Sequence, residues 1–166
     1  MKPTLIAGDL FVTNSPNLLG KCIRTIERIW SLDSDASYNH AGIIISPAGL
    51  TLEALLTFRI SKLDKYLGRK VLIVRHKEMT GERCAAGLKA VQEDVGKCYP
   101  VFRLVLFLIP PLAKFSLFGR GVCSEQTAKF LKGAGFGNVV YGVTPDNLAD
   151  LWRESKSMDI IYEGVW

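Results

Sequence analysis

The chain has 166 residues, of which 48% are hydrophobic and 22% charged, with a formal net charge of +5 at pH 7. That length suits one domain with a sizeable apolar core, and the composition argues against intrinsic disorder. Lysine and arginine are scattered, without the basic runs that mark nucleic-acid-binding arms, so nucleic acid is not an expected partner. No repeat or linker interrupts the sequence, and residues 1–166 are predicted to form a single domain.

The cysteines bear on metal binding and on the cellular compartment. They are widely spaced and form no CxxC pair: Cys22, Cys84, Cys98 and Cys123. This spacing supports neither a zinc site nor a disulfide framework, so reduced thiols in a cytoplasmic compartment are expected. Pro3 and Asp9 fall where a signal peptide would need an uninterrupted apolar run, which predicts that there is no export signal.

The first half of the chain predicts strands and one helix. After Ser15 and Pro16, an N-cap and a first-turn proline, residues 17–30 carry apolar side chains on one helical face. The run "HAGIIIS" is β-branched and typical of a strand buried on both faces, and "PAGL" marks the turn after it. The expected strands are residues 8–13, 40–46, 51–56 and 70–76.

The second half predicts mainly helices. Thr80 can cap a helix that ends at Gly96, and a helix that opens at Cys123 is closed by Gly133 or Gly135. A short strand in "NVVYGV" precedes a helix that starts near Pro145, and residues 158–166 form the last strand. Helices and an antiparallel sheet, partly segregated along the chain, indicate an α+β domain.

Residues 104–113, "LVLFLIPPLA", form the most apolar segment. It is shorter than the roughly 20 residues that span a bilayer, and Pro110-Pro111 would break a helix, so no membrane span is expected. One interpretation is a buried helix followed by a turn. The other is an apolar wall or lid beside a lipid or acyl substrate, in peripheral contact with a membrane or lipid.

Cys123 follows Gly119 and Gly121 and opens a predicted helix. The unpaired N–H groups and positive dipole end of a helix N-terminus favour a thiolate, and the two glycines would leave the sulfur uncovered. A small buried hydrophobic residue at a helix start is the alternative.

A cysteine nucleophile needs a base, and the chain offers two imidazoles. His76 ends a strand among charged residues and is expected to face solvent. His40 opens an apolar strand, so its ring is expected at the rim of the core.

Glu53 favours His40 over His76 as the base. If the loop between the two strands has an even number of residues, Glu53 shares a face of the sheet with His40, whereas an odd loop sends it to the other face. A glutamate among apolar residues must be paired, and orienting a histidine would satisfy it. Pairing with a surface lysine instead would carry no functional meaning.

Several stretches, in this order, resemble one family: "GDLF", "YNHAGIII", "LEALL", "GKCYP", "CSEQTAKFL" and "TPDNL", from residue 8 to about residue 150. They are similar to the permuted branch of the NlpC-type papain-like superfamily, which includes bacterial amidase-like proteins and relatives of lecithin:retinol acyltransferase. The joint order of these stretches, and no single one of them, carries the resemblance.

The resemblance implies a permuted papain-like fold with Cys123 as nucleophile, His40 as base and Glu53 as the residue that orients the imidazole. Tyr99 matches a tyrosine often found near the site, and Tyr38 is a second candidate for contact with the substrate or the oxyanion. The family commonly has serine before its histidine, where this chain has Asn39, and the residues after Tyr99 diverge, so the substrate wall is not inferred.

The expected function is therefore a cysteine hydrolase (an amidase, a thiol protease or a lipid acyl hydrolase) or an acyltransferase. It would work through a thioester, with no metal or organic cofactor. Peptides, cell-wall fragments, and lipid or acyl compounds all fit as substrates. The alternative is a non-catalytic binding module that keeps the papain-like groove.

Overall fold

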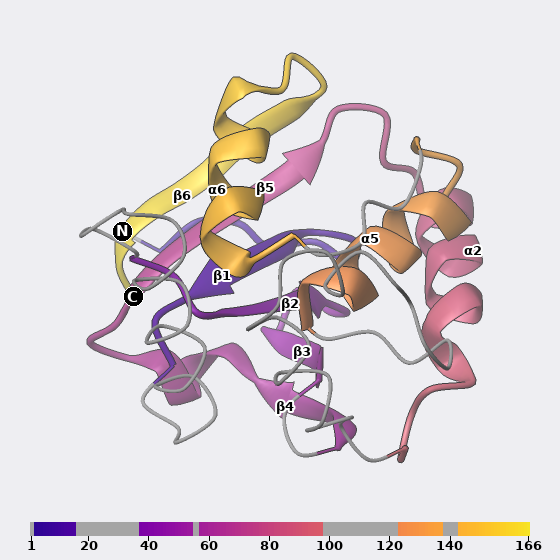
Figure 1. The fold of residues 1–166 in the computed structure, drawn as a ribbon, viewed down its shortest axis with the longest axis horizontal. Helices are drawn as coiled ribbons and strands as arrows, with labels where there is room; N and C mark the ends of the chain where they lie inside the picture. Colours follow the sequence, from indigo (N-terminus) through magenta and orange to yellow (C-terminus); the bar gives the residue numbers. More distant parts are fainter. Residues whose placement is uncertain (1, 16–36, 55–56, 98–122, 138–142) are drawn as a thin grey trace, which may run out of the picture.

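The computed structural model describes residues 2–15, 37–54, 57–97, 123–137 and 143–166, which are coloured in Figure 1. In these ranges the chain is α+β, with a six-stranded sheet, three α-helices and one short 3-10 helix. Every pair of neighbouring strands is antiparallel. The α+β class and the antiparallel sheet expected from the sequence are confirmed.

The strands are β1 (Leu10–Thr13), β2 (His40–Ile44), β3 (Leu50–Ala54), β4 (Phe58–Lys62), β5 (Lys70–His76) and β6 (Met158–Val165). The helices are α2 (Gly81–Gln92), α5 (Cys123–Gly133) and α6 (Pro145–Glu154), with the 3-10 helix η1 at Leu63–Tyr66. The order of strands across the sheet is β4-β3-β2-β1-β5-β6. The β2–β3 pair, which carries His40 and Glu53, therefore lies inside the sheet and not at an edge.

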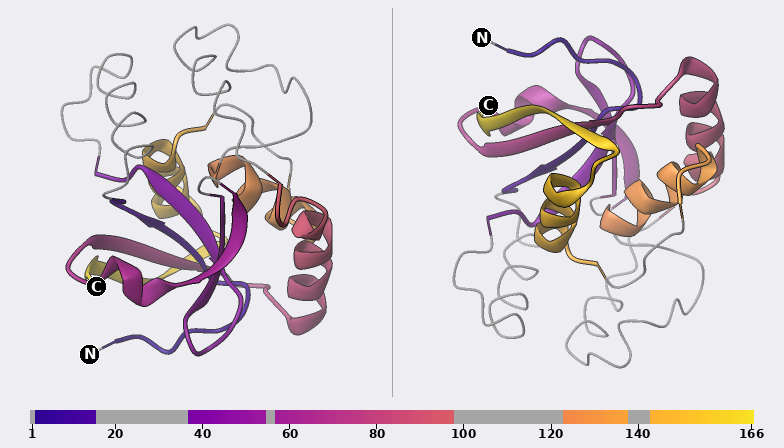
Figure 2. Two further views of the ribbon diagram at one scale, coloured as in Figure 1. Left: turned by 90° about the horizontal axis from the view of Figure 1, so that it is seen from below. Right: turned by 90° about the horizontal axis from the view of Figure 1, so that it is seen from above.

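The sheet is apolar on both faces because each face is covered. Alternate strand residues such as Val12 and Ile43 pack with residues of α2, α5 and α6 in one buried cluster. Their neighbours Phe11 and Ile44 point the other way and pack with Leu63 and Tyr66 of η1 in a second cluster. Figure 2 shows the three α-helices gathered on one side of the sheet. The continuous β-branched run of β2 is the sequence sign of this double burial.

Helices α2 and α5 pack closely, and this contact fixes α5 against the sheet. A Cβ placed on Gly87 of α2 would lie 2.7 Å from the ring of Phe130 in α5, and one on Gly133 would meet Ala90. Phe130 itself is fully buried. Small residues at these crossing points let the two helix backbones approach, and the helix that begins with Cys123 is thereby held in place.

Most of the predicted elements are confirmed, with two differences. The segment from Phe58 to Tyr66 forms β4 and η1, which the sequence pattern did not predict, because β4 is an edge strand with mostly exposed side chains. Helix α2 is capped by Thr80 as expected but ends at Gln92, and turns follow up to Gly96. The expected helix at 17–30 and most of the short strand before Pro145 lie outside the described residues.

None of the helices in the described ranges has the length and the apolar composition needed to span a membrane. Residues 104–113, for which the sequence left two interpretations open, are not among the described residues.

Candidate functional site

His40 is the first residue of β2, where the strand enters the sheet. It pairs with Thr13 of β1, and the residue is only 4% exposed. The ring packs against two aromatic side chains, 6.3 Å from the ring centre of Phe11 in an edge contact and 6.0 Å from that of Tyr66, and these two rings also contact each other at 5.9 Å. The imidazole, expected at the rim of the core, is buried and packs against this aromatic pair.

Asn39 fixes the start of β2. Its side-chain oxygen accepts a hydrogen bond from the backbone N–H of Ser15 at 2.6 Å, and its amide donates to the Ser15 carbonyl at 3.1 Å. Its own backbone N–H donates to the carbonyl of Thr13 at 3.1 Å. A serine here, as in the family the sequence resembles, has a shorter side chain with a single hydroxyl. In this chain Asn39 ties the residue before His40 to the segment after β1.

Glu53 shares a face of the sheet with His40. The β2–β3 connection is a four-residue turn at 46–49, an even number, because Ile45 pairs with Leu50 and Gly49 bonds back to Ser46. Glu53 consequently lies opposite Gly42, two residues along from His40. Its Oε2 lies 2.8 Å from Nε2 of His40. The predicted contact between the carboxylate and the imidazole is confirmed.

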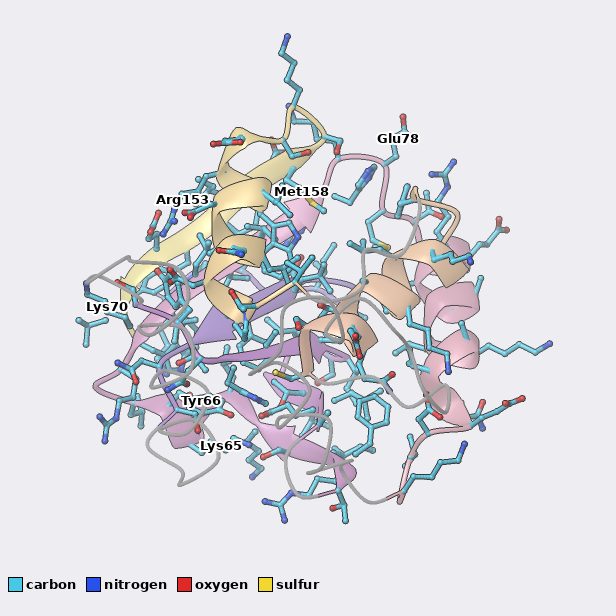
Figure 3. All side chains as sticks on the ribbon, viewed as in Figure 1. Lys65, Tyr66, Lys70, Glu78, Arg153 and Met158 are labelled. Carbon is cyan, nitrogen blue, oxygen red and sulfur yellow. The ribbon has the colours of Figure 1, made fainter. Side chains whose placement is uncertain are left out.

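Three further donors hold the Glu53 carboxylate, and the sequence did not reveal them. Tyr66 donates its hydroxyl to Oε2 at 2.6 Å, and the Nζ of Lys65 lies 2.9 Å from the same oxygen. Thr51 donates to Oε1. The carboxylate is fully buried, and each oxygen is satisfied, as a buried charge requires. Figure 3 labels Lys65 and Tyr66, near strands β3 and β4.

These contacts determine the charges of the pair. Burial alone would raise the pKa of Glu53, but the His40 hydrogen bond and the positive charges of His40 and Lys65 outweigh it and lower the pKa to about 2. Burial would lower the pKa of His40, but contact with Cys123 and Glu53 overcomes this and raises the pKa to about 9. Burial next to Glu53 raises the pKa of Tyr66, which keeps its hydroxyl a donor. An ionised carboxylate beside an imidazolium results.

Cys123 is the first residue of α5, as predicted, and the helix reaches the sheet at β2 and β3. Its side chain lies close enough to the His40 ring to raise the pKa of the imidazole. Because Nε2 of His40 is engaged by Glu53, Nδ1 is the ring nitrogen left for the thiol. The imidazole therefore connects the carboxylate on one side with the sulfur on the other.

One expectation for Cys123 is not met. The sulfur was expected to be partly open, but the residue is 2% exposed, almost the same as Cys84 at 4%. The first residues of α5 are buried as a group: Cys123, Ser124, Glu125, Gln126 and Thr127. The helix start is buried because α5 packs on the sheet from its first turn. Gly119 and Gly121, which were expected to uncover the sulfur, lie outside the described residues.

The two candidate tyrosines differ in what the structure says about them. Tyr38 is buried, and its hydroxyl donates to Glu163 of β6 at 3.3 Å, away from the β2–β3 pair. Burial and the charge of Glu163 raise its pKa to about 12. A role for Tyr38 at the substrate stays a prediction. Tyr99 lies outside the described residues.

His76 does not face solvent as expected. It ends β5 with only 9% of its surface exposed, and its ring stacks on Phe136 with the ring centres 3.6 Å apart. Its Nδ1 accepts a hydrogen bond from the backbone N–H of Glu78 at 3.2 Å. Burial lowers the pKa of His76, opposite in direction to that of His40. The charged residues next to His76 in sequence gave no sign of Phe136, which is distant in the chain.

A Cys–His–Glu arrangement of this kind can move a proton from sulfur to imidazole and hold the resulting imidazolium on a carboxylate. A thiolate generated in this way attacks electrophilic carbon, and Cys123 stands at the start of α5, where the first N–H groups of a helix favour negative charge. The geometry therefore fits nucleophilic chemistry at a carbonyl.

Comparison with known proteins gives a likeness of fold alone. No family model matches the chain, and a search of curated proteins finds no match. Among solved structures, the chain is similar to the metalloprotein YiiX of Escherichia coli O157:H7, described as DUF1105, with a TM-score of 0.64 and 16% sequence identity. The likeness covers 97% of this chain and 98% of that one. It extends over both the sheet and the helices.

The description as a metalloprotein applies to YiiX and not to this chain. In the parts of this chain that the structure describes, no three or more His, Cys, Asp or Glu side chains gather so as to hold a metal ion. His40 and Glu53 use their facing atoms on each other, and Lys65 and Tyr66 occupy the carboxylate oxygen that a metal ion would need. The donor set at His40 and Glu53 thus does not fit a metal ion.

Proposed function

We propose that this chain is a cysteine hydrolase or acyltransferase of the permuted NlpC-type papain-like kind, acting on an amide or ester bond. The observation that carries the proposal is the position of His40, whose Nε2 lies 2.8 Å from the buried Glu53 carboxylate while the ring also faces Cys123. The likeness of fold to YiiX supplies no activity. The order of the matched sequence stretches and the site geometry support the proposal together.

The reaction begins from an ion pair in which the proton of the Cys123 thiol has already passed to Nδ1 of His40, because the raised pKa of His40 favours the imidazolium. The thiolate attacks the substrate carbonyl carbon and forms a C–S bond, and the backbone N–H of Cys123 helps to hold the oxyanion. When the tetrahedral intermediate collapses, the bond to the amine or alcohol breaks and the leaving group takes the proton from His40. The product of this half is a thioester on Cys123.

The second half releases the acyl group. Water or another acceptor gives a proton to His40 and attacks the thioester carbon, and the C–S bond breaks with the electron pair returning to sulfur. Glu53 stabilises the imidazolium each time it forms and keeps Nδ1 directed at the sulfur. Hydrolysis and acyl transfer differ only in which acceptor enters.

Activated esters test the proposal without knowledge of the natural substrate. The protein is incubated with p-nitrophenyl acetate or p-nitrophenyl octanoate, quenched in acid and digested, and the acyl group is located by mass spectrometry. We expect the acyl group on Cys123 and its loss in the Cys123→Ser and His40→Ala variants. Preference for octanoate would favour a lipid or acyl substrate. Acylation of other residues only, unchanged in Cys123→Ser, would refute the proposal.

A non-catalytic binding module is the second candidate, and the burial of Cys123 favours it. A side chain that is 2% exposed has little access for a substrate carbonyl. In that case Glu53, His40 and Cys123 would form a buried polar network that stabilises the fold. This candidate expects no acyl group on Cys123 and a marked loss of stability when Cys123 is replaced by serine.

A further inference from the structure

The Glu53 carboxylate is shared by two cationic groups. Its Oε2 atom lies 2.8 Å from Nε2 of His40 and 2.9 Å from Nζ of Lys65. Glu53 is fully buried, whereas the Lys65 side chain is 30% exposed and reaches inward from the surface of η1. One carboxylate oxygen therefore lies between the imidazole and an ammonium group that enters from solvent.

Proton movement makes the second cation necessary. In the proposed reaction, on which this inference rests, His40 gives its proton to the leaving group and becomes neutral. A carboxylate with no exposed surface would then lack a counterion, and an unpaired charge in a protein interior is costly. We propose that Lys65 is a positioning residue that serves as the counterion of Glu53 whether His40 is charged or neutral. His40 can then release its proton without leaving the buried carboxylate unpaired.

The structure of η1 holds Lys65 close to Glu53. Leu63 and Tyr66, on either side of it in the 3-10 helix, are each 1% exposed and anchor the segment in the core. The Tyr66 hydroxyl donates to the same carboxylate oxygen at 2.6 Å. The ammonium also donates to Ser61 at 2.8 Å and lies 4.8 Å from the centre of the Tyr66 ring. Lys65 is thus held over Glu53 by contacts that do not depend on the state of His40.

The charge balance at His40 depends on groups from several elements. Among the described residues, Cys123 acts on the ring from α5 and Glu53 from β3, Tyr66 of η1 contacts the ring, Lys65 of η1 pairs with Glu53, and Arg59 of β4 acts on Tyr66. Glu53 and a Cys123 thiolate favour the imidazolium. The Lys65 charge opposes it, because it repels a second cation and shares the carboxylate. Without Lys65, the proton should be held on His40 more tightly.

Nuclear magnetic resonance can measure this effect, because the chain has only two histidines. The two imidazoles are titrated in the full-length Cys123→Ala variant, which removes the thiol, and in the same variant carrying Lys65→Met. We expect Lys65→Met to raise the pKa of His40 by about one pH unit, after allowance for solvent screening of a partly exposed ammonium. His76 should not shift, and its signal reports folding in the same sample.

Three further variants separate charge from structure. Lys65→Arg restores the cation and should return the pKa of His40 toward its starting value. Lys65→Gln keeps a hydrogen-bond donor without the charge and should behave as Lys65→Met does. Lys62→Met removes a cation that lies one residue before η1 and makes no contact with Glu53, so it should leave His40 unchanged. If Lys65→Met does not fold, Lys65→Gln and Lys65→Arg decide the question.

The proposal is overturned if His40 titrates alike with and without the Lys65 charge, or if Lys65→Gln matches the parent and not Lys65→Met. In the chain that retains Cys123, Lys65→Met should lower kcat for the activated esters with little change in KM. If the parent shows no turnover at all, the proposed function fails, while the titration still decides whether Lys65 is the counterion of Glu53.

Discussion

Gly42 lies directly opposite Glu53 across the β2–β3 pair, and no side chain fits between them. A Cβ on Gly42 would lie 3.0 Å from Cγ of Glu53 and 2.6 Å from the ring of Phe11. Since Phe11 also supports the His40 ring, one glycine allows both the carboxylate and the aromatic ring to approach the imidazole.

We therefore predict that Gly42→Ala destabilises the protein and disturbs the site. Displacement of Phe11 or Glu53 should cost about 1–3 kcal/mol in the free energy of unfolding, as overpacking does. Urea unfolding measures the loss, and acylation by p-nitrophenyl acetate measures the site. Gly81→Ala is the control, because nothing lies within 4 Å of a Cβ there. Equal stability of the two variants would contradict the role given to Gly42.

The two histidines should differ in their effect on turnover. His40→Ala removes the proposed base and should lower kcat by about 10²–10⁴-fold, the usual contribution of general acid–base catalysis. His76→Ala removes the stack on Phe136 and should affect stability, not kcat. Ester turnover is compared at a temperature where circular dichroism shows both variants folded. Equal losses of turnover at equal stability would mean that the wrong imidazole has been assigned.

Replacing Glu53 should separate charge from shape. Glu53→Gln keeps an acceptor oxygen but not the charge that stabilises the imidazolium, so it should lower kcat more than it raises KM. Glu53→Ala should in addition loosen the His40 ring and leave Lys65 and Tyr66 without their shared partner. Steady-state kinetics of both variants provide the test. A Glu53→Gln variant with unchanged kcat would show that the carboxylate charge plays no part in the reaction.

The free energy of unfolding should depend on pH in two windows. The pKa of Glu53 is lowered from 4.5 to about 2. Its contribution to the free energy of unfolding is therefore complete above pH 4.5 and is lost as the pH falls through about 2. His40, with its pKa raised from 6.5 to about 9, contributes stability that is complete below 6.5 and lost as the pH rises through 9. His40→Gln should reduce the alkaline decline, as followed by urea unfolding across the pH range. An alkaline decline of the same size in both proteins would contradict this assignment.

Local patterns were sufficient to predict much of the fold. β-branched runs marked β2 and β5, and Thr80 and Pro145 marked helix starts, because these signals act within a few residues of the chain. β4 was missed because its edge position exposes Arg59, Ile60 and Lys62, which together look like a polar loop. No alternation of buried and exposed residues was available to indicate it.

In the site, too, some contacts could be predicted from local patterns and others could not. The face shared by His40 and Glu53 could be predicted conditionally, since it depends only on the length of one turn. The partners Lys65 and Tyr66 come from an unpredicted element, and the partner of His76, Phe136, is 60 positions away in sequence. The burial of Cys123 depends on how α5 packs on the sheet. Such non-local contacts leave no periodic trace in the sequence.

The most direct test of Cys123 as the nucleophile activated by His40 is the rate at which iodoacetamide labels Cys123 relative to Cys84, measured by mass spectrometry as a function of pH. The two cysteines are almost equally buried, at 2% and 4% exposure, so access differs little between them. Burial and the nearby Asp9 raise the pKa of Cys84, whereas Cys123 faces an imidazole with a pKa of about 9. We expect Cys123 to be labelled first at neutral pH, ahead also of Cys22 and Cys98, and we expect His40→Ala to remove this advantage while leaving the Cys84 rate unchanged. Labelling of Cys123 no faster than Cys84, or a Cys123 rate unaffected by His40→Ala, would contradict the assignment of Cys123 as the nucleophile.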